Sequence, residues 1–168
     1  FDFFNLEKLN TKSDFVKVVK NTPLINIDFC IYKNNKILLG ERKNSPAKNF
    51  YFVPGGRIYK DELIKSAINR ILNEELGYKL PSKNIDKCEF IGFFEHHYLD
   101  NFLGNFEFTT HYVILAYKLN LDYLEKISER VSKDQHSEYK WYDFSKNPEN
   151  IKIHKYCKAY FKYLNNIS

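Results

Sequence analysis

Two adjacent carboxylates, Glu74 and Glu75, follow a glycine-rich stretch within PGGRIYKDELIKSAINRILNEELGY, residues 54–78. A hard cation such as Mg²⁺ prefers oxygen ligands and usually takes only one or two carboxylates, together with substrate phosphates. Gly55 and Gly56 let a bare backbone approach such a metal or an anion closely. The pattern indicates a platform for phosphate chemistry. Solvated ions on an ordinary amphipathic helix are the alternative that the helix by itself leaves open.

Ile71 stands at a place where such a platform would accept a third carboxylate. It belongs instead to an apolar stripe at helical spacing that we expect to be buried. The members of the stripe are Ile64, Ala67, Ile68, Ile71 and Leu72. On the charged side of the helix, Arg70 and Glu74 are four residues apart and share a face, with Glu62 two turns earlier.

Regular elements that could position these residues follow from capping residues and periodicity. A first helix is expected over residues 13–20, capped by Ser13 and stopped by Pro23. A second is expected over 61–77, with Asp61 as N-cap, Glu62 in the first turn and Gly77 at the end. A third is expected from near Pro148 through residue 164. Strands are expected at 24–32, 36–42, 51–54, 88–98, 109–119 and 139–144, with a hairpin turn at 33–36. In the first strand, Ile25 lies on the apolar face and Asp28 on the other, which points Asp28 away from the core. The order predicts an α/β sandwich.

Composition narrows the class of protein. The 168 residues, 43% of them hydrophobic, suffice for a single domain over residues 1–168, and no run of about 18 apolar residues could span a bilayer. The net charge of +5 comes from dispersed lysines, so we expect a small anionic substrate and no nucleic acid. The start of the chain does not resemble a signal peptide. Cys30, Cys88 and Cys157 are widely separated and do not suggest a disulfide framework, so a cytoplasmic location is expected.

The charged residues of the segment are also spaced in a specific way. Gly56 is followed after five residues by Glu62, after seven more by Arg70, and then by Glu74, Glu75 and Gly77. This spacing resembles the signature of the Nudix hydrolases, except that Ile71 replaces one glutamate of that signature. The resemblance implies a Nudix-type α/β/α sandwich with a mixed sheet, carrying the signature at about residues 55–77.

Over about residues 15–161 the chain resembles one branch of that family, the GDP-mannose mannosyl hydrolases. The stretches that carry this resemblance are TPLINIDF, LLGER, YFVPGGR, DNF, FTTHYVILAY and DQHSEYKW. Members of the branch hold a single Mg²⁺, have an apolar residue where Ile71 lies, and break the bond between the sugar's anomeric carbon and oxygen. In that reaction the metal only has to make GDP a better leaving group. Glu74 departs from the branch, which often has a small residue there.

The resemblance implies a metal site and a general base. Its Mg²⁺ ligands would be Glu75, Gln135 and the carbonyl of Gly55, and Mn²⁺ could substitute. His136 resembles the general base, a role that suits imidazole because its usual pKa of about 6.5 leaves it mostly neutral at pH 7. Without the resemblance, Gln135 would be taken as a loop residue and His136 as a surface histidine.

Further roles concern charge and substrate. Arg42, Arg57 and Arg70 resemble the cations that meet the pyrophosphate and the charge growing on the departing GDP. A structural ion pair with Glu62 or Glu74 is the competing interpretation for Arg70, and both roles could hold at once. The substrate-site residues of the resemblance are Asp28, His96 and Tyr112, whereas His97 and His111 match nothing and are expected at packing or surface positions.

Three functions are compatible with these residues. The first is hydrolysis of GDP-mannose, or GDP-glucose, to GDP and the free sugar with inversion. The second is cleavage of the P–O–P bond of a nucleotide sugar or nucleotide, which Glu74 favours and Ile71, Gln135 and His136 oppose. The third is a non-catalytic nucleotide-sugar sensor, which the near-complete set of catalytic residues opposes. The resemblance also implies a homodimer.

Overall fold

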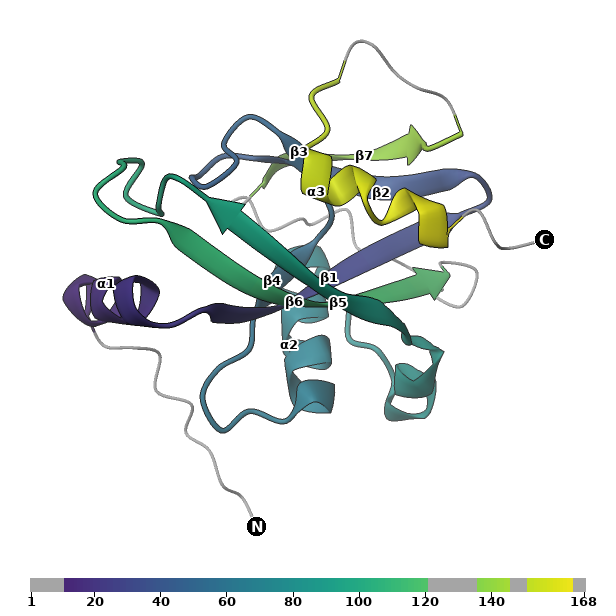
Figure 1. The fold of residues 1–168 in the computed structure, drawn as a ribbon. Helices are drawn as coiled ribbons and strands as arrows, with labels where there is room; N and C mark the ends of the chain where they lie inside the picture. Colours follow the sequence, from purple (N-terminus) through teal and green to yellow (C-terminus); the bar gives the residue numbers. More distant parts are fainter. Residues whose placement is uncertain (1–10, 121–135, 146–150, 165–168) are drawn as a thin grey trace.

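One mixed sheet organises the fold in the computed structural model, which describes residues 11–120, 136–145 and 151–164. Within these ranges seven strands follow the order β3-β2-β1-β6-β5, with β4 paired to β1 and β7 paired to β2 (Figure 1). The strands are β1 (Leu24–Lys33), β2 (Lys36–Arg42), β3 (Tyr51–Phe52), β4 (Gly55–Arg57), β5 (Glu89–Tyr98), β6 (Thr110–Asn120) and β7 (His136–Asp143). β1 and β6 run parallel, and the other pairs run antiparallel.

Helices cover both faces of this sheet (Figure 1). On one face, α2 (Ile64–Leu76) packs its buried stripe against β1 and β6 in a cluster that includes Ile27, Phe29, Ala67, Ile68, Ile71, Leu72, Leu115 and Leu119. On the other face, α3 (Lys155–Lys158) and the short helix η3 (Phe161–Tyr163) pack in a cluster that includes Cys30, Ile37, Leu39, Ile114, Ala116, Cys157, Tyr160 and Leu164. The predicted α/β/α sandwich with a mixed sheet is confirmed.

The two faces of β1 differ from the sequence-based expectation. Ile25 was expected in the core but is 49% exposed, near the start of the strand. Asp28 was expected to point away from the core but is only 5% exposed. The reason is that the second face of β1 is not solvated, because α3 and η3 cover it. The hairpin turn is confirmed, and Asn34 adopts the positive φ of 52° that this turn needs.

The beginning of α2 also differs from its prediction. Asp61 is not the N-cap: it has a φ of 63° in the preceding loop, and the helix starts at Ile64 with Leu63 at the cap position. Glu62 therefore precedes the helix, where it accepts a hydrogen bond from the N–H of Tyr59 at 3.0 Å. The first member of the predicted stripe, Ile64, is 44% exposed.

The end of α2 and its remaining stripe agree with prediction. Gly77 ends the helix in a left-handed conformation with a φ of 63°, and its N–H reaches the carbonyl of Asn73. Ile71 is 1% exposed, as expected for a stripe residue.

The other predicted helices are shifted. α1 (Lys12–Asn21) is capped by the side chain of Thr11, not by Ser13. The last helix begins at Lys155 with His154 as its cap, whereas the predicted start at Pro148 lies outside the described residues. A short helix η1 (Ser82–Lys87) precedes β5 and was not predicted.

The cysteines are buried and free, which agrees with the sequence-based prediction of no disulfide framework. Burial raises the pKa of the Cys88 thiol to about 12. In the part of the chain that the structure describes, no helix has the length and apolar character needed to cross a membrane.

Candidate active site

A cleft of about 240 Å³ opens where β1, β4, β5, β6 and the C-terminal half of α2 meet. Of the residues predicted from the sequence, the structure brings eight to its walls: Asp28, Arg42, Gly55, Arg57, Arg70, Glu75, His96 and Tyr112. Phe15, Asn26, Tyr59, Glu74 and Tyr98 also line it. Gln135 lies outside the described residues, and His136 is described as the first residue of β7, with its backbone opposite Arg42.

Arg70 is the centre of an ion-pair network on one wall. Its Nε and Nη2 donate to the two carboxylate oxygens of Glu62 at 2.7 and 2.8 Å, and its Nη1 donates to Glu74 at 2.8 Å. Its Nη2 also donates to the carbonyl of Arg57 at 2.8 Å, and its guanidinium lies over the ring of Tyr59. Burial opposes ionisation of Glu62, but the hydrogen bonds from Arg70 and from Tyr59 outweigh it, so the pKa of Glu62 is lowered.

These contacts favour the structural alternative for Arg70. Four hydrogen bonds occupy most of the five N–H donors of its guanidinium, and they connect the β4 backbone, the loop before α2 and α2 itself. Arg70 thus holds the glycine-rich segment against the helix.

Glu75 is the buried carboxylate of α2 at the cleft. It is 2% exposed and accepts a hydrogen bond from the hydroxyl of Tyr139 on β7 at 2.8 Å. Burial raises the pKa of Glu75 to about 7, against the lowering effects of that hydrogen bond and of Arg42. A carboxylate in such surroundings gains from a nearby cation, because the cation offsets the lost hydration of its charged form.

The residues around Glu75 fit a hard divalent cation. Gly55 pairs with Asp28 so closely that a Cβ on this glycine would lie 2.5 Å from the Asp28 Oδ1 and 2.7 Å from the carbonyl of Ile27. Only glycine fits there, and its backbone lies bare at the cleft wall. The buried carboxylate of Glu75 and a backbone carbonyl of Gly55 are oxygen donors of the type that Mg²⁺ takes.

Two further arginines give the cleft positive charge. The Nε of Arg42 donates to the carbonyl of Pro46 at 2.9 Å, in the loop between β2 and β3. Arg57 on β4 lies over the rings of Phe15 and Tyr59, at 4.4 and 5.5 Å from the ring centroids, and burial lowers the pKa of its guanidinium. Arginines at the wall of a partly buried cleft suit a phosphate-bearing ligand, because guanidinium matches phosphate oxygens in pairs.

A buried hydrogen-bond chain connects Asp28 to His96 through a residue that the sequence analysis did not single out. The hydroxyl of Tyr160 donates to Asp28 at 2.7 Å and lies 3.2 Å from the Nε2 of His96. Burial raises the pKa of Asp28 to about 6, although Tyr160 and Arg42 act to lower it. Burial and the neighbouring charges of His154 and Arg42 lower the pKa of His96 to about 3, so its ring is neutral at pH 7.

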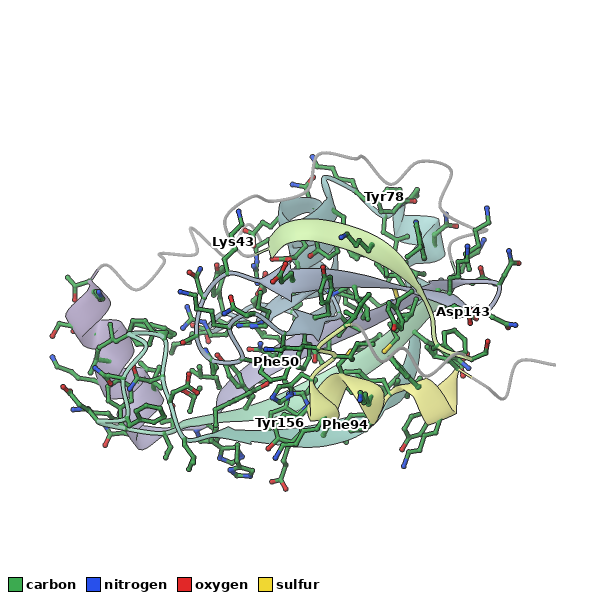
Figure 2. The ribbon with its side chains drawn as sticks, turned by 90° about the horizontal axis from the view of Figure 1, so that it is seen from above. Lys43, Phe50, Tyr78, Phe94, Asp143 and Tyr156 are labelled. Carbon is green, nitrogen blue, oxygen red and sulfur yellow. The ribbon has the colours of Figure 1, made fainter. Side chains whose placement is uncertain are left out.

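The C-terminal segment supplies Tyr160 to this chain and packs against the cleft residue His96. α3 passes over β5 at Tyr156 and Phe94 (Figure 2). The ring of Tyr156 stacks on that of His96 with centroids 4.3 Å apart, and Phe94 packs edge-on against Tyr160. The sequence offered no local signal for Tyr160, which is one of 13 tyrosines and lies 132 residues from Asp28. Tyr139, the partner of Glu75, was likewise assigned only to a strand.

Comparison with known proteins identifies the family. The model of the NUDIX domain matches residues 23–162, which is most of the chain. The chain belongs to the NUDIX domain family. It is 31% identical over 144 residues to the low-salt glycan biosynthesis protein Agl8 of Haloferax volcanii, covering 85% of this chain and 83% of that protein.

Two further similarities are more limited. Over 55 residues, 33% of this chain and 32% of its relative, the chain is 42% identical to an ADP-ribose pyrophosphatase of Methanocaldococcus jannaschii. The crystal structure of a MutT NUDIX hydrolase from Burkholderia pseudomallei has a TM-score of 0.63 at 22% identity, over 84% of this chain and 98% of that one. This structure shares the fold. The resemblance to Nudix hydrolases seen in the sequence is confirmed at the level of the family.

Proposed function

We propose that this Nudix hydrolase cleaves a GDP-sugar, GDP-mannose or GDP-glucose, to GDP and the free sugar by attack of water at the anomeric carbon with inversion. The observation that carries the proposal is that α2 offers the cleft one buried carboxylate, Glu75. Glu62 and Glu74 are paired with Arg70, and the position that would provide another carboxylate is the buried Ile71. Attack at carbon needs less from the metal than attack at phosphorus, so a site with one such carboxylate favours it.

The residues of the cleft would divide the work as follows. Glu75, the Gly55 carbonyl and Gln135 would hold Mg²⁺, which when bound neutralises the pyrophosphate and improves GDP as a leaving group. Arg42 and Arg57 would bind the phosphate oxygens and stabilise the charge that grows on the departing GDP.

The sugar side of the reaction would fall to another set of residues. His136 would take the proton from the attacking water. Asp28, His96 and Tyr112 would contact the sugar, and Tyr160 would hold Asp28 and His96 in register through the hydrogen bonds described above. The similarity to a glycan biosynthesis protein supports a sugar-bearing substrate.

Other parts of the proposal concern the protein as a whole. We propose a single domain over residues 1–168 that acts as a homodimer on a small nucleotide-sugar substrate, without nucleic-acid or membrane partners. Three buried, free cysteines support a reducing, cytoplasmic location.

The second candidate is a pyrophosphohydrolase that cleaves the P–O–P bond. Glu74 favours it, because this carboxylate lines the cleft and its side chain is 47% exposed, so it could leave Arg70 to bind a second cation. The partial similarity to an ADP-ribose pyrophosphatase supports the same candidate.

One experiment separates the two candidates. GDP-mannose is hydrolysed with Mg²⁺ in ¹⁸O-labelled water, and the products are analysed by phosphorus NMR and mass spectrometry. The proposal expects GDP without label and mannose carrying label at its anomeric hydroxyl. GMP and a sugar phosphate, with label on phosphorus, would establish the second candidate, and unchanged substrate with tight GDP-mannose binding would indicate a sensor.

A matched pair of variants tests the carrying observation. Glu75→Gln should lower the rate of GDP-mannose hydrolysis by at least roughly 10–100-fold, because loss of a group that only hydrogen-bonds a metal ligand already costs that much. Glu74→Gln makes the same substitution at the neighbouring residue and should lower the rate much less if the site depends on Glu75. Equal losses in both variants would support the two-carboxylate site of a pyrophosphohydrolase.

A further inference from the structure

A second group of metal-type ligands lies on the β5–β6 hairpin, formed by Glu95, His97 and His111. His97 and His111 are directly opposite each other in the antiparallel register, and Glu95 is two residues before His97 on the same strand. Residues at i and i+2 of a strand share one face, and a directly opposed residue lies within about 5 Å at Cβ. One ligand atom from each side chain falls within 4.8 Å of the other two.

This group is separate from the cleft. His96 lies between Glu95 and His97 and lines the cleft, as does Tyr112, the neighbour of His111. Successive side chains of a strand point to opposite faces, so the three ligands lie on the reverse side of the hairpin. None of the described residues that line the cleft belongs to the group, and the substrate proposed above would not touch it.

Among the described residues, one ring nitrogen of this group lacks a hydrogen-bond partner. The rings of His97 and His111 stack with centroids 4.2 Å apart. The Nε2 of His111 is shielded from solvent and has no hydrogen-bond partner among the residues that the structure describes. The nearest carboxylate oxygen, from Glu95, is 4.0 Å away, which is too far for a hydrogen bond. A cation between these atoms would supply the missing partner for the Nε2 of His111.

We propose that Glu95, His97 and His111 bind a transition-metal cation of the Zn²⁺ type. Two imidazole nitrogens with one carboxylate oxygen suit Zn²⁺, Ni²⁺ or Cu²⁺ better than Mg²⁺, which prefers oxygen ligands only. A three-ligand site leaves a fourth tetrahedral position open for water or another small ligand.

The site can close around an ion with small side-chain movements. Zn²⁺ lies about 2.0–2.1 Å from nitrogen and oxygen ligands, which places neighbouring tetrahedral ligand atoms about 3.3 Å apart. The present separations of 4.0 Å and at most 4.8 Å exceed that by little. The side chain of Glu95 is 71% exposed and that of His111 is 35% exposed, so rotation of Glu95 and of the exposed His97 can bring the atoms together without moving the strands.

A bound ion would have a consequence for the cleft behind it. β5 is the last strand in the sheet order and pairs only with β6 among the described strands. The ion would join the two strands at the register positions next to His96 and Tyr112. It would therefore stiffen the part of the edge strand that carries these two cleft residues.

The test is a titration of the whole protein with ZnCl₂ in the presence of excess Mg²⁺, followed by ¹H–¹⁵N spectra of the histidine rings. The proposal expects one equivalent of Zn²⁺ to shift the ring nitrogens of His97 and His111. Calorimetry should show that His97→Ala and Glu95→Gln each weaken this binding roughly tenfold or more. Because both residues are exposed, these variants should remain folded.

A control on the same strand makes the test specific. Glu89→Gln removes an exposed β5 carboxylate that pairs with Lys118 and should leave Zn²⁺ affinity unchanged. Ring shifts confined to other histidines, or an affinity that His97→Ala and Glu95→Gln leave unchanged, would overturn the proposal. Because the readout is Zn²⁺ binding on the reverse side of the hairpin, it is independent of whether the cleft hydrolyses a GDP-sugar.

Discussion

Replacing Asp28 with asparagine should stabilise the protein at neutral and alkaline pH. Asp28 is 5% exposed and accepts a hydrogen bond from the hydroxyl of Tyr160 at 2.7 Å. An asparagine oxygen can accept the same hydrogen bond, so Asp28→Asn keeps the contact and the shape while it removes the buried charge. The variant isolates the cost of burying that charge.

The size and sign of the expected change in unfolding free energy follow from the pKa of Asp28. Burial raises this pKa from 3.8 to about 6 in the folded protein. The unfolded chain therefore releases the proton near the lower value and the folded chain only near the higher one, so the wild type loses stability as pH rises through this window. A difference of about two pKa units corresponds to about 3 kcal/mol of unfolding free energy. We therefore expect Asp28→Asn to be more stable than the wild type by about 2–3 kcal/mol above this pH window.

The assay is urea unfolding of both proteins at pH 4 to 8 in buffer with EDTA, which removes any cation bound at the cleft. The difference in unfolding free energy should be near zero at pH 4, grow up to about pH 6 and then stay constant. Titrating groups that do not interact with Asp28 cancel in this difference. Glu75 adds a smaller contribution of the same sign, because the charge of Asp28 is one of the causes that raise the pKa of Glu75. Asp86→Asn is the control, because Asp86 is a solvent-exposed aspartate paired with Lys65 and should give a small, flat difference.

One result would refute the reasoning. If Asp28→Asn is less stable than the wild type at pH 8, the ionised carboxylate must be held by a partner strong enough to overcome its burial. A stabilised variant that has also lost activity would agree with the placement of Asp28 in the cleft, since buried charges at functional sites commonly cost stability.

Three further outcomes are expected. Ile71→Glu should lower the unfolding free energy by a few kcal/mol in urea titrations, because it buries a carboxylate, and should not raise the rate of GDP release; a stable, faster variant would contradict this. His136→Gln should lower kcat by about 10²–10⁴-fold and flatten the acidic limb of its pH profile, with little change in Mg²⁺ affinity by calorimetry; a normal kcat would leave water activation to another group. Arg70→Lys should cost about 2–3 kcal/mol by the same urea assay, since lysine cannot donate to Glu62 and the β4 backbone together; Lys65→Met, at an exposed pair, is its control and should cost little.

The sequence predicted local structure correctly where that structure depends on the periodicity of one helix or strand. The stripe through Ile71 is buried apart from its first member, Ile64, Gly77 ends α2, and Asn34 forms the hairpin turn, because each depends on neighbours within a few residues. The family signature added residues that no period could have found, and most of them line one cleft.

Contacts between distant residues decided the rest. Asp28 lies on the less apolar face of β1, but nothing near it in the sequence indicates that Tyr160 covers that face. Asp61 has the residue type of an N-cap, yet Glu62 is held before the helix by the fork of Arg70, and the helix starts two residues later. In both cases a tertiary hydrogen bond outweighed the local preference.

The loss of a carboxylate at position 71 can be explained by packing and by charge together. A Cβ on Gly56 would lie 3.1 Å from the side chain of Ile71, so β4 and α2 touch at this point. The cleft already contains two buried carboxylates, Asp28 and Glu75, whose pKa values burial raises to about 6 and about 7. A glutamate at position 71 would add a third negative charge beside them, and like charges raise each other's pKa further. Without a second cation, such a group would hold its proton and serve as no ligand. Ile71 therefore fits the one-cation site proposed above, because an isoleucine at this position both packs under β4 and provides no metal ligand.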